Sequence, residues 1–69
     1  MILDIGPGCG TYVDLLGKKK YHWTGIEVFD KYVEKYKLDS KYDEIIIGDA
    51  RRVELPEADL IIFGDVLIK

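Results

Sequence analysis

The sequence has few of the features that stabilise small proteins, such as disulfides and structural metal sites. A single cysteine excludes an internal disulfide, and no cluster of cysteine and histidine residues offers a structural metal site. A chain of 69 residues buries only about 60% of the surface that its unfolded form exposes. Yet 48% of the residues are hydrophobic and 33% are charged, which is typical of a globular protein. We therefore expect a folded unit that is marginally stable unless something further supports it.

Positive charge and long apolar runs are also scarce. Acidic residues outnumber basic ones by 13 to 10, whereas segments that bind phosphate backbones usually carry a basic stripe, so nucleic-acid binding by this segment is not expected. The longest apolar runs, 45–47 and 60–63, fall far short of the roughly 18 residues that span a bilayer. No basic leader precedes the first apolar segment. These features predict a cytoplasmic protein without membrane contact.

Apolar segments alternate with segments of helical spacing. Strands are predicted over residues 1–5, 22–28, 44–48 and 59–64, and helices over 11–16 and 30–37. The apolar runs are continuous, which is typical of strands covered on both faces, and the alternating order predicts a parallel α/β sheet. Right-handed crossovers would place both helices on one face of it. The chain contains no repeat or linker, so we expect residues 1–69 to form one domain.

Both predicted helices show sequence patterns for capping residues and for an apolar packing face. Thr11 and Asp14 have the spacing of a capping box, and Asp30 can cap the second helix. The first helix places four apolar residues on one side, and the second has an apolar face at i, i+3, i+4 and i+7. These predicted packing faces are Tyr12, Val13, Leu15 and Leu16 in the first helix, and Phe29, Tyr32, Val33 and Tyr36 in the second.

Three polar features follow successive predicted strands. A loop with three glycines, residues 6–10, follows the first strand and would let a ligand approach the backbone closely. Glu27 ends the second strand and could accept hydrogen bonds from two ribose hydroxyls. Asp49 follows the third and suits an exocyclic amine such as that of adenine. Each feature alone also fits a tight turn or a solvated strand end, but together they predict a nucleoside site at the carboxyl edge of the sheet.

The spacing of the glycines indicates which nucleoside fits. The dinucleotide fingerprint G-x-G-x-x-G requires glycine at position 11, where this chain has Thr11. Asp4, just before the loop, would repel a pyrophosphate but suits a ligand that carries an ammonium group. A cationic nucleoside is therefore favoured over NAD, and an NAD-dependent oxidoreductase is the third-ranked alternative.

Four segments together resemble the class I S-adenosylmethionine-dependent methyltransferases. They are residues 2–11, 25–28, 46–50 and 59–67, so the resemblance covers nearly the whole chain. It implies a Rossmann-like sheet and S-adenosylmethionine or S-adenosylhomocysteine as ligand. It also implies contacts to the methionine part from the first segment, to the ribose and adenine from the second and third, and to the methyl donor from the fourth. The residues implied are Asp4, Gly6, Pro7, Gly8, Cys9 and Gly10; Glu27 and Val28; Asp49 and Ala50; and Asp65.

Members of that family continue for about three further strands, and many place catalytic residues at or beyond the fourth motif. We therefore expect residues 1–69 to be the N-terminal, cofactor-binding half of such a fold, with the methyl acceptor and catalytic residues unidentified. The alternative is a non-catalytic module, natural or engineered, that binds S-adenosylmethionine or another adenosine ligand. We expect Arg51 and Arg52 to lie in a solvated loop; the alternatives are that they shield the adenine or bind a substrate phosphate.

The connection over residues 50–58 is too short for a helical crossover, which needs about a dozen residues. No element would then cover the second face of the sheet, and an exposed apolar patch of that size is unusual in a soluble monomer. We therefore predict self-association into a homodimer or a larger homo-oligomer.

Overall fold

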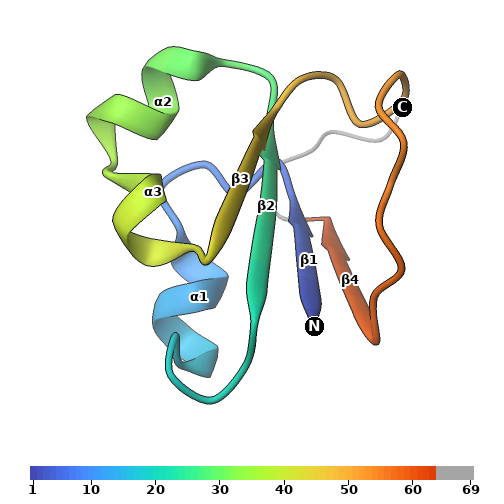
Figure 1. Ribbon diagram of the computed structural model, residues 1–69. Coiled ribbons are helices and arrows are strands. Elements are labelled where there is room, and N and C mark those ends of the chain that lie inside the picture. Colours follow the sequence, from blue (N-terminus) through green and yellow to red (C-terminus); the bar gives the residue numbers. More distant parts are fainter. Residues whose placement is uncertain (64–69) are drawn as a thin grey trace.

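A computed structural model describes residues 1–63, and the predicted site residue Asp65 lies outside them. Four strands and three short helices follow one another in this part of the chain (Figure 1). Each predicted strand is present. The elements are β1 (Ile2–Ile5), α1 (Thr11–Leu16), β2 (Trp23–Glu27), α2 (Asp30–Lys35), α3 (Leu38–Lys41), β3 (Glu44–Ile47) and β4 (Leu60–Phe63).

The strands form one parallel sheet in the order β3-β2-β1-β4. Ile5, at the end of β1, is in register with Ile26 on β2 and with Phe63 on β4. Because β2 and β4 lie on opposite sides of β1, the chain reverses its direction of travel across the sheet at β1. This is the order of the first four strands in a doubly wound Rossmann sheet, so the predicted α/β, Rossmann-like class is confirmed.

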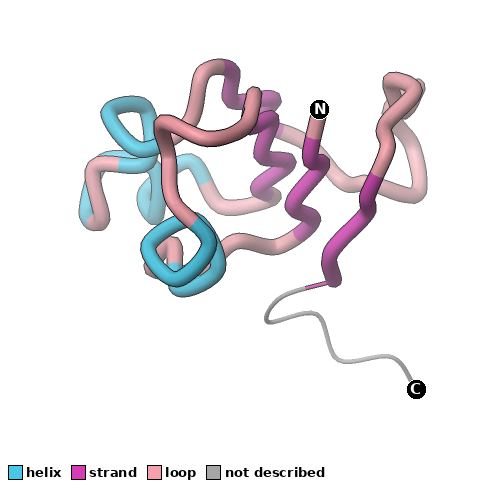
Figure 2. The backbone as a smooth tube through the Cα atoms, turned by 90° about the horizontal axis from the view of Figure 1, so that it is seen from below, coloured by secondary structure: helices cyan, strands magenta, loops and turns pink. Residues whose placement is uncertain are grey.

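One face of the sheet carries all three helices, as Figure 2 shows. Trp23 is fully buried there, its ring edge-on to Tyr42 at 6.1 Å between centroids, and its Nε1 donates to the Gly17 carbonyl. A Cβ at Gly25 would lie only 3.1 Å from the Tyr42 ring, so glycine makes room for this packing. We call this group the helix-face cluster: Ile2, Val13, Trp23, Leu38 and Tyr42.

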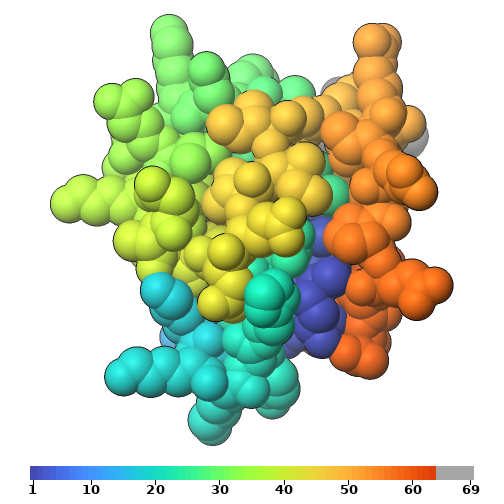
Figure 3. Space-filling view, in the orientation of Figure 1, coloured from blue at the N-terminus to red at the C-terminus, as the bar shows by residue number. Residues whose placement is uncertain are grey.

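The opposite face is covered by the loop between β3 and β4, so the prediction of an uncovered second face is wrong for the central strands. Leu3, Ile5 and Ile26 are buried beneath partly buried side chains of that loop. The loop folds back closely, because Val53 Cγ1 lies 2.8 Å from where a Cβ of Gly48 would be. In Figure 3 the loop (orange) and the segment around β3 (yellow) leave a strip of β1 (blue) visible between them. The covering residues are Ala50, Val53 and Ala58.

The predicted capping box of the first helix is wrong. Gly10 is the N-cap of α1 and no side chain caps it; the Thr11 hydroxyl instead lies 3.3 Å from Cys9 Sγ. Only Val13 of the predicted apolar face is buried, because a helix of six residues makes fewer than two turns and brings a single side chain onto the sheet. The exposed members of that face are Tyr12, Leu15 and Leu16.

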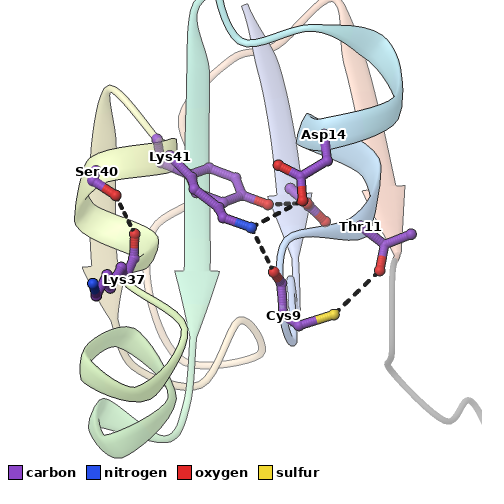
Figure 4. A network of polar contacts seen from close by, with 8 residues as sticks. Cys9, Thr11, Asp14, Lys37, Ser40 and Lys41 are labelled. Atoms are coloured by element: carbon purple, nitrogen blue, oxygen red, sulfur yellow. Dashed lines mark hydrogen bonds and ion pairs between the residues drawn. The ribbon is translucent and has the colours of Figure 1, made fainter.

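The predicted second helix is divided into α2 and α3. Its N-cap is Phe29 rather than Asp30, and Lys37 adopts a left-handed conformation with φ of 53° between the two helices. On a continuous helix Leu38 would lie about 140° around the axis from Val33, so both could not face the sheet. The break lets Leu38 join the core, and Ser40 Oγ donates to the Lys37 carbonyl to begin the new turn (Figure 4). Within residues 1–63 no helix is long and apolar enough to cross a membrane.

Candidate functional site

Two adjoining cavities open at the carboxyl ends of the strands. The loop-side cavity, about 400 Å³, lies between the ends of the strands and the loop after β3. The helix-side cavity, about 500 Å³, lies between the glycine loop and α2. Gly6 and Val28 line both, so the two cavities share a wall, and each has the size of a small-molecule site. The loop-side lining also includes Ile5, Ile26, Asp49, Ala50 and Arg51; the helix-side lining includes Gly8, Cys9, Glu27, Tyr32 and Tyr36.

The glycine loop turns sharply between β1 and α1. Gly6, Gly8 and Gly10 have φ angles of 66°, 58° and 84°, a region in which a residue with a Cβ is strained. The Gly6 N–H donates to the Ile26 carbonyl, which continues the pairing of β1 with β2 into the loop. Gly6, Gly8 and Cys9 line the helix-side cavity, whereas the predicted site residues Pro7 and Gly10 are buried and line neither cavity.

Lys41, at the end of α3, ties this loop in place. Its Nζ donates to the Cys9 carbonyl at 3.1 Å and to Asp14 Oδ2 at 2.9 Å (Figure 4). The same side chain lies 3.0 Å from where a Cβ of Gly10 would be. One side chain thus joins α3, the glycine loop and α1. Sequence reasoning missed this residue, because its partners lie 27 and 32 residues away and follow no local pattern.

Asp4 lies on β1, two residues before the glycine loop. It is fully buried on the helix side of β1, and it lies outside the linings of both cavities. The Tyr42 hydroxyl donates to Asp4 Oδ2. Burial, and then this hydrogen bond, raise the pKa of Tyr42 above its ordinary value, so the phenol stays a donor. The structure therefore gives Asp4 a bracing contact between β1 and the segment after α3.

Glu27 is placed as predicted, at the end of β2 and in the wall of the helix-side cavity. The residue is only 3% exposed, and its Oε2 accepts a hydrogen bond from the Phe29 N–H at 3.1 Å. An ionised carboxylate offers about four acceptor positions, so Glu27 retains capacity for two hydroxyl donors. Its carbonyl accepts from the Gly48 N–H, which fixes the end of β2 against β3.

Asp49 lines the loop-side cavity, as its place after β3 predicts, but Arg51 holds its side chain. The Arg51 backbone N–H and Nε donate to Asp49 Oδ1 at 2.9 and 3.1 Å, and a terminal guanidinium nitrogen donates to Oδ2 at 2.7 Å. These hydrogen bonds lower the pKa of Asp49 to about 2. Arg51 therefore belongs to the cavity lining and is not only a solvated loop residue.

Three aromatic rings border the helix-side cavity. Phe29 and Tyr32 lie 5.4 Å apart between centroids, and Tyr32 and Tyr36 lie 5.5 Å apart. The prediction that Phe29 and Tyr32 pack onto the sheet is wrong, since both are exposed, while Tyr36 packs against the helix-face cluster and also lines the cavity. Helical spacing alone does not distinguish a ring that lines a cavity from one in the core.

The chemistry of the two linings differs. The loop-side cavity has apolar walls and the Asp49–Arg51 pair, which suits a flat ring with a polar edge. Within residues 1–63 the helix-side lining contains Glu27 and no lysine or arginine, so it suits hydroxyl groups or a cation and would repel a phosphate. Together the cavities fit a nucleoside without phosphates.

Comparisons with known proteins identify a methyltransferase among the relatives of this chain. No protein-family model matches the chain. It is 36% identical, over 64 residues, to a protein described as probable ribosomal RNA small subunit methyltransferase A from Thermococcus onnurineus (strain NA1). The match covers 90% of this chain but 24% of the relative, so the chain spans about a quarter of that protein's length. The chain is thus related in sequence to a methyltransferase.

Proposed function

We propose that this chain forms the cofactor-binding part of a cytoplasmic, class I S-adenosylmethionine-dependent methyltransferase. The observation that carries the proposal is the position of Glu27 and Asp49 in two adjoining cavities, at the carboxyl ends of neighbouring parallel strands and beside a glycine loop. The similarity to a methyltransferase supports it.

The linings suggest how the ligand would lie. The adenine would occupy the loop-side cavity, between the apolar side chains of Ile26 and Val28 and the backbone of Ala50, with Asp49 accepting from its amine. The ribose hydroxyls would donate to Glu27, and the methionine part would lie along Gly6 and Gly8 in the helix-side cavity. The wall that the cavities share at Gly6 and Val28 allows one nucleoside to occupy both.

The bound cofactor would supply an activated methyl group on a sulfonium centre. Because that group is already electrophilic, the residues of this chain mainly have to bind and orient the ligand. Glu27 and Asp49 set the position of the nucleoside, and the glycine loop, held by Lys41, sets the distance of the backbone from it.

For the methyl acceptor we propose ribosomal RNA of the small subunit, because the relative from Thermococcus onnurineus is described as a methyltransferase of that RNA. The net charge of −3 predicts that residues 1–69 contribute little to RNA affinity. Adding this segment in excess should therefore leave RNA binding by the whole protein unchanged. Competition by the segment would contradict this assignment.

Isothermal titration calorimetry with S-adenosylhomocysteine tests the proposal. Glu27→Gln should weaken binding by about 5- to 150-fold, the equivalent of about 1–3 kcal/mol for a lost buried polar partner. Asp49→Asn, at a partly exposed side chain, should also weaken binding. Glu54→Gln, an exposed residue outside both linings, is the matched control and should bind as the wild type does. NAD should not bind. Binding that is indifferent to both site variants, or equal binding of NAD, would refute the proposal.

A non-catalytic binding module is the second candidate. It is favoured by the composition of the linings, which within residues 1–63 hold acceptors and aromatic rings but neither histidine nor lysine as a general base. Methyl transfer from labelled S-adenosylmethionine to small-subunit RNA, assayed with the whole protein, separates the two. Tight cofactor binding without transfer would favour the module.

We also propose that the chain self-associates. The side chains of Leu60, Ile61 and Phe63 on β4 are between 44% and 54% exposed, an apolar strip that a second copy would cover. Light scattering should then give at least a dimer at micromolar concentration, and Leu60→Lys should shift it towards the monomer. A monomeric wild type with a cooperative unfolding transition would contradict this.

A further inference from the structure

Asp49 and Arg51 form the only charged pair in the lining of the loop-side cavity, within the part of the chain that the structure describes. The pair is unequal in exposure: the side chain of Asp49 is 26% exposed and that of Arg51 is 87% exposed. The arginine therefore reaches the carboxylate from the solvent side, and both residues come from the same short turn after β3.

The number of donors on each carboxylate oxygen is informative. Asp49 Oδ1 accepts two hydrogen bonds, from the backbone N–H and the Nε of Arg51, whereas Oδ2 accepts one, from a terminal nitrogen. A carboxylate oxygen has two acceptor positions. Arg51 thus saturates Oδ1 and leaves a single position on Oδ2, which can accept one N–H of a ligand amine.

We propose that Arg51 is a positioning residue, which orients Asp49 so that Oδ2 presents one acceptor position and thereby selects a ligand base with an exocyclic amine. This inference rests on the proposed function, because the amine belongs to the nucleoside assigned to this cavity. Without Arg51 the carboxylate would rotate among its rotamers, and the ligand would have to order it on binding. The two-pronged guanidinium removes that freedom before the ligand arrives.

Arg51 also keeps the acceptor ionised. Its hydrogen bonds hold the pKa of Asp49 near 2, and Arg52 is the other charged group that lowers it. Without the Arg51 side chain the carboxyl pKa should rise towards its ordinary value of about 3.9. Protonation turns one carboxyl oxygen into a donor and weakens the other as an acceptor. A variant without Arg51 should therefore lose much of its preference for an amine as the pH falls through 4, while the wild type keeps it.

The experiment compares two ligands on three proteins by calorimetry. S-adenosylhomocysteine carries the amine, and S-inosylhomocysteine has a carbonyl oxygen in its place. Arg51→Met should weaken binding of the adenosyl ligand by about three- to tenfold, since exposed ion pairs are weak, and leave the inosyl ligand unchanged. Arg52→Met, a neighbouring and exposed arginine, is the matched control and should keep the wild-type ratio. Because the two ligands differ only in the base, the ratio of their affinities isolates the effect of the amine.

A double variant sharpens the result. If Arg51 acts through Asp49, Arg51→Met should cause no further loss of preference in an Asp49→Asn background. An unchanged ratio in Arg51→Met, or tighter binding of the adenosyl ligand, would overturn the inference, the latter by showing that Arg51 competes with the ligand for Asp49. Failure of the wild type to bind either ligand would instead refute the proposed function, and this inference with it.

Discussion

The two faces of the sheet are built from similar apolar strands but are covered in different ways. On the helix face Val13, Trp23 and Leu38 are almost completely buried. Long-range hydrogen bonds join Lys41 to the glycine loop and Tyr42 to β1. On the loop face the covering side chains, such as Val53, are only partly buried. The helix face is therefore a rigid support, whereas the loop face is a lighter cover.

This difference assigns distinct tasks to the two proposed halves of the ligand site. The helix-side cavity is formed by elements that the packed helices hold in place, for example through the hydrogen bond from Lys41 to the glycine loop. Glu27 and this loop therefore have fixed positions before a ligand binds. The loop-side cavity depends on a local contact, the pair of Asp49 and Arg51 within one turn. We expect changes on the helix face to affect the whole fold, and changes on the loop face to remain local.

The largest effect is expected from Tyr42→Phe, which removes the hydroxyl that donates to the buried Asp4 carboxylate. The free energy of unfolding should fall by about 1.5–3 kcal/mol, the range for hydrogen bonds to charged groups. Thermal and urea denaturation followed by circular dichroism measure this loss. Tyr32→Phe, on an exposed ring, is the control and should leave stability unchanged.

The pH dependence of stability tests whether this loss comes from the hydrogen bond between Tyr42 and Asp4. The pKa of Tyr42 is raised in the folded state, so its contribution to stability is complete below the unfolded value of about 10 and is lost as the pH rises above it. The stability difference between the wild type and Tyr42→Phe should therefore shrink above pH 10. A constant difference across that range would show that the hydroxyl contributes in another way.

A matched pair of valine substitutions compares the two faces directly. Val13→Ala on the helix face should cost about 2 kcal/mol, because two buried methyl groups are lost and a cavity remains. Val53→Ala on the loop face should cost less than about 1 kcal/mol, since its side chain is only partly buried. Equal losses of stability would mean that the loop covers its face as firmly as the helices cover theirs.

The smallest of these effects is expected from Lys41→Met, which breaks the tie between α3 and the glycine loop. The Lys41 side chain is partly exposed, so the cost should be below about 1 kcal/mol, as for other exposed ion pairs. Amide hydrogen exchange should instead become faster at Gly10 and its neighbours, while the core remains protected. Lys31→Met, on the exposed side of α2, should change neither. Unaltered exchange in the loop would show that its glycine turns hold it without Lys41.

The positions of Glu27 and Asp49 could be predicted from the sequence because Glu27 is the last residue of β2 and Asp49 follows β3 by two residues. Strand ends are local features, and parallel strands bring their carboxyl ends to one edge. The helices were less predictable, because helical spacing places Phe29, Tyr32 and Tyr36 together without indicating which ring is buried. Asp4 fits a ligand contact by its position in the sequence, and only the structure shows that Tyr42 hydrogen-bonds to it.

The sequence by itself determined the parallel α/β class, the glycine turns and the carboxylates that end two neighbouring strands, since each depends on residues within a few positions of one another. Tertiary structure decided the rest: that β4 pairs with β1, that α3 braces the glycine loop, and that residues 48–59 cover the second face. Those arrangements join residues far apart in the chain. The same apolar side chains could be buried in several ways, and the arrangement of lowest free energy depends on the whole chain. A local sequence pattern therefore does not reveal it.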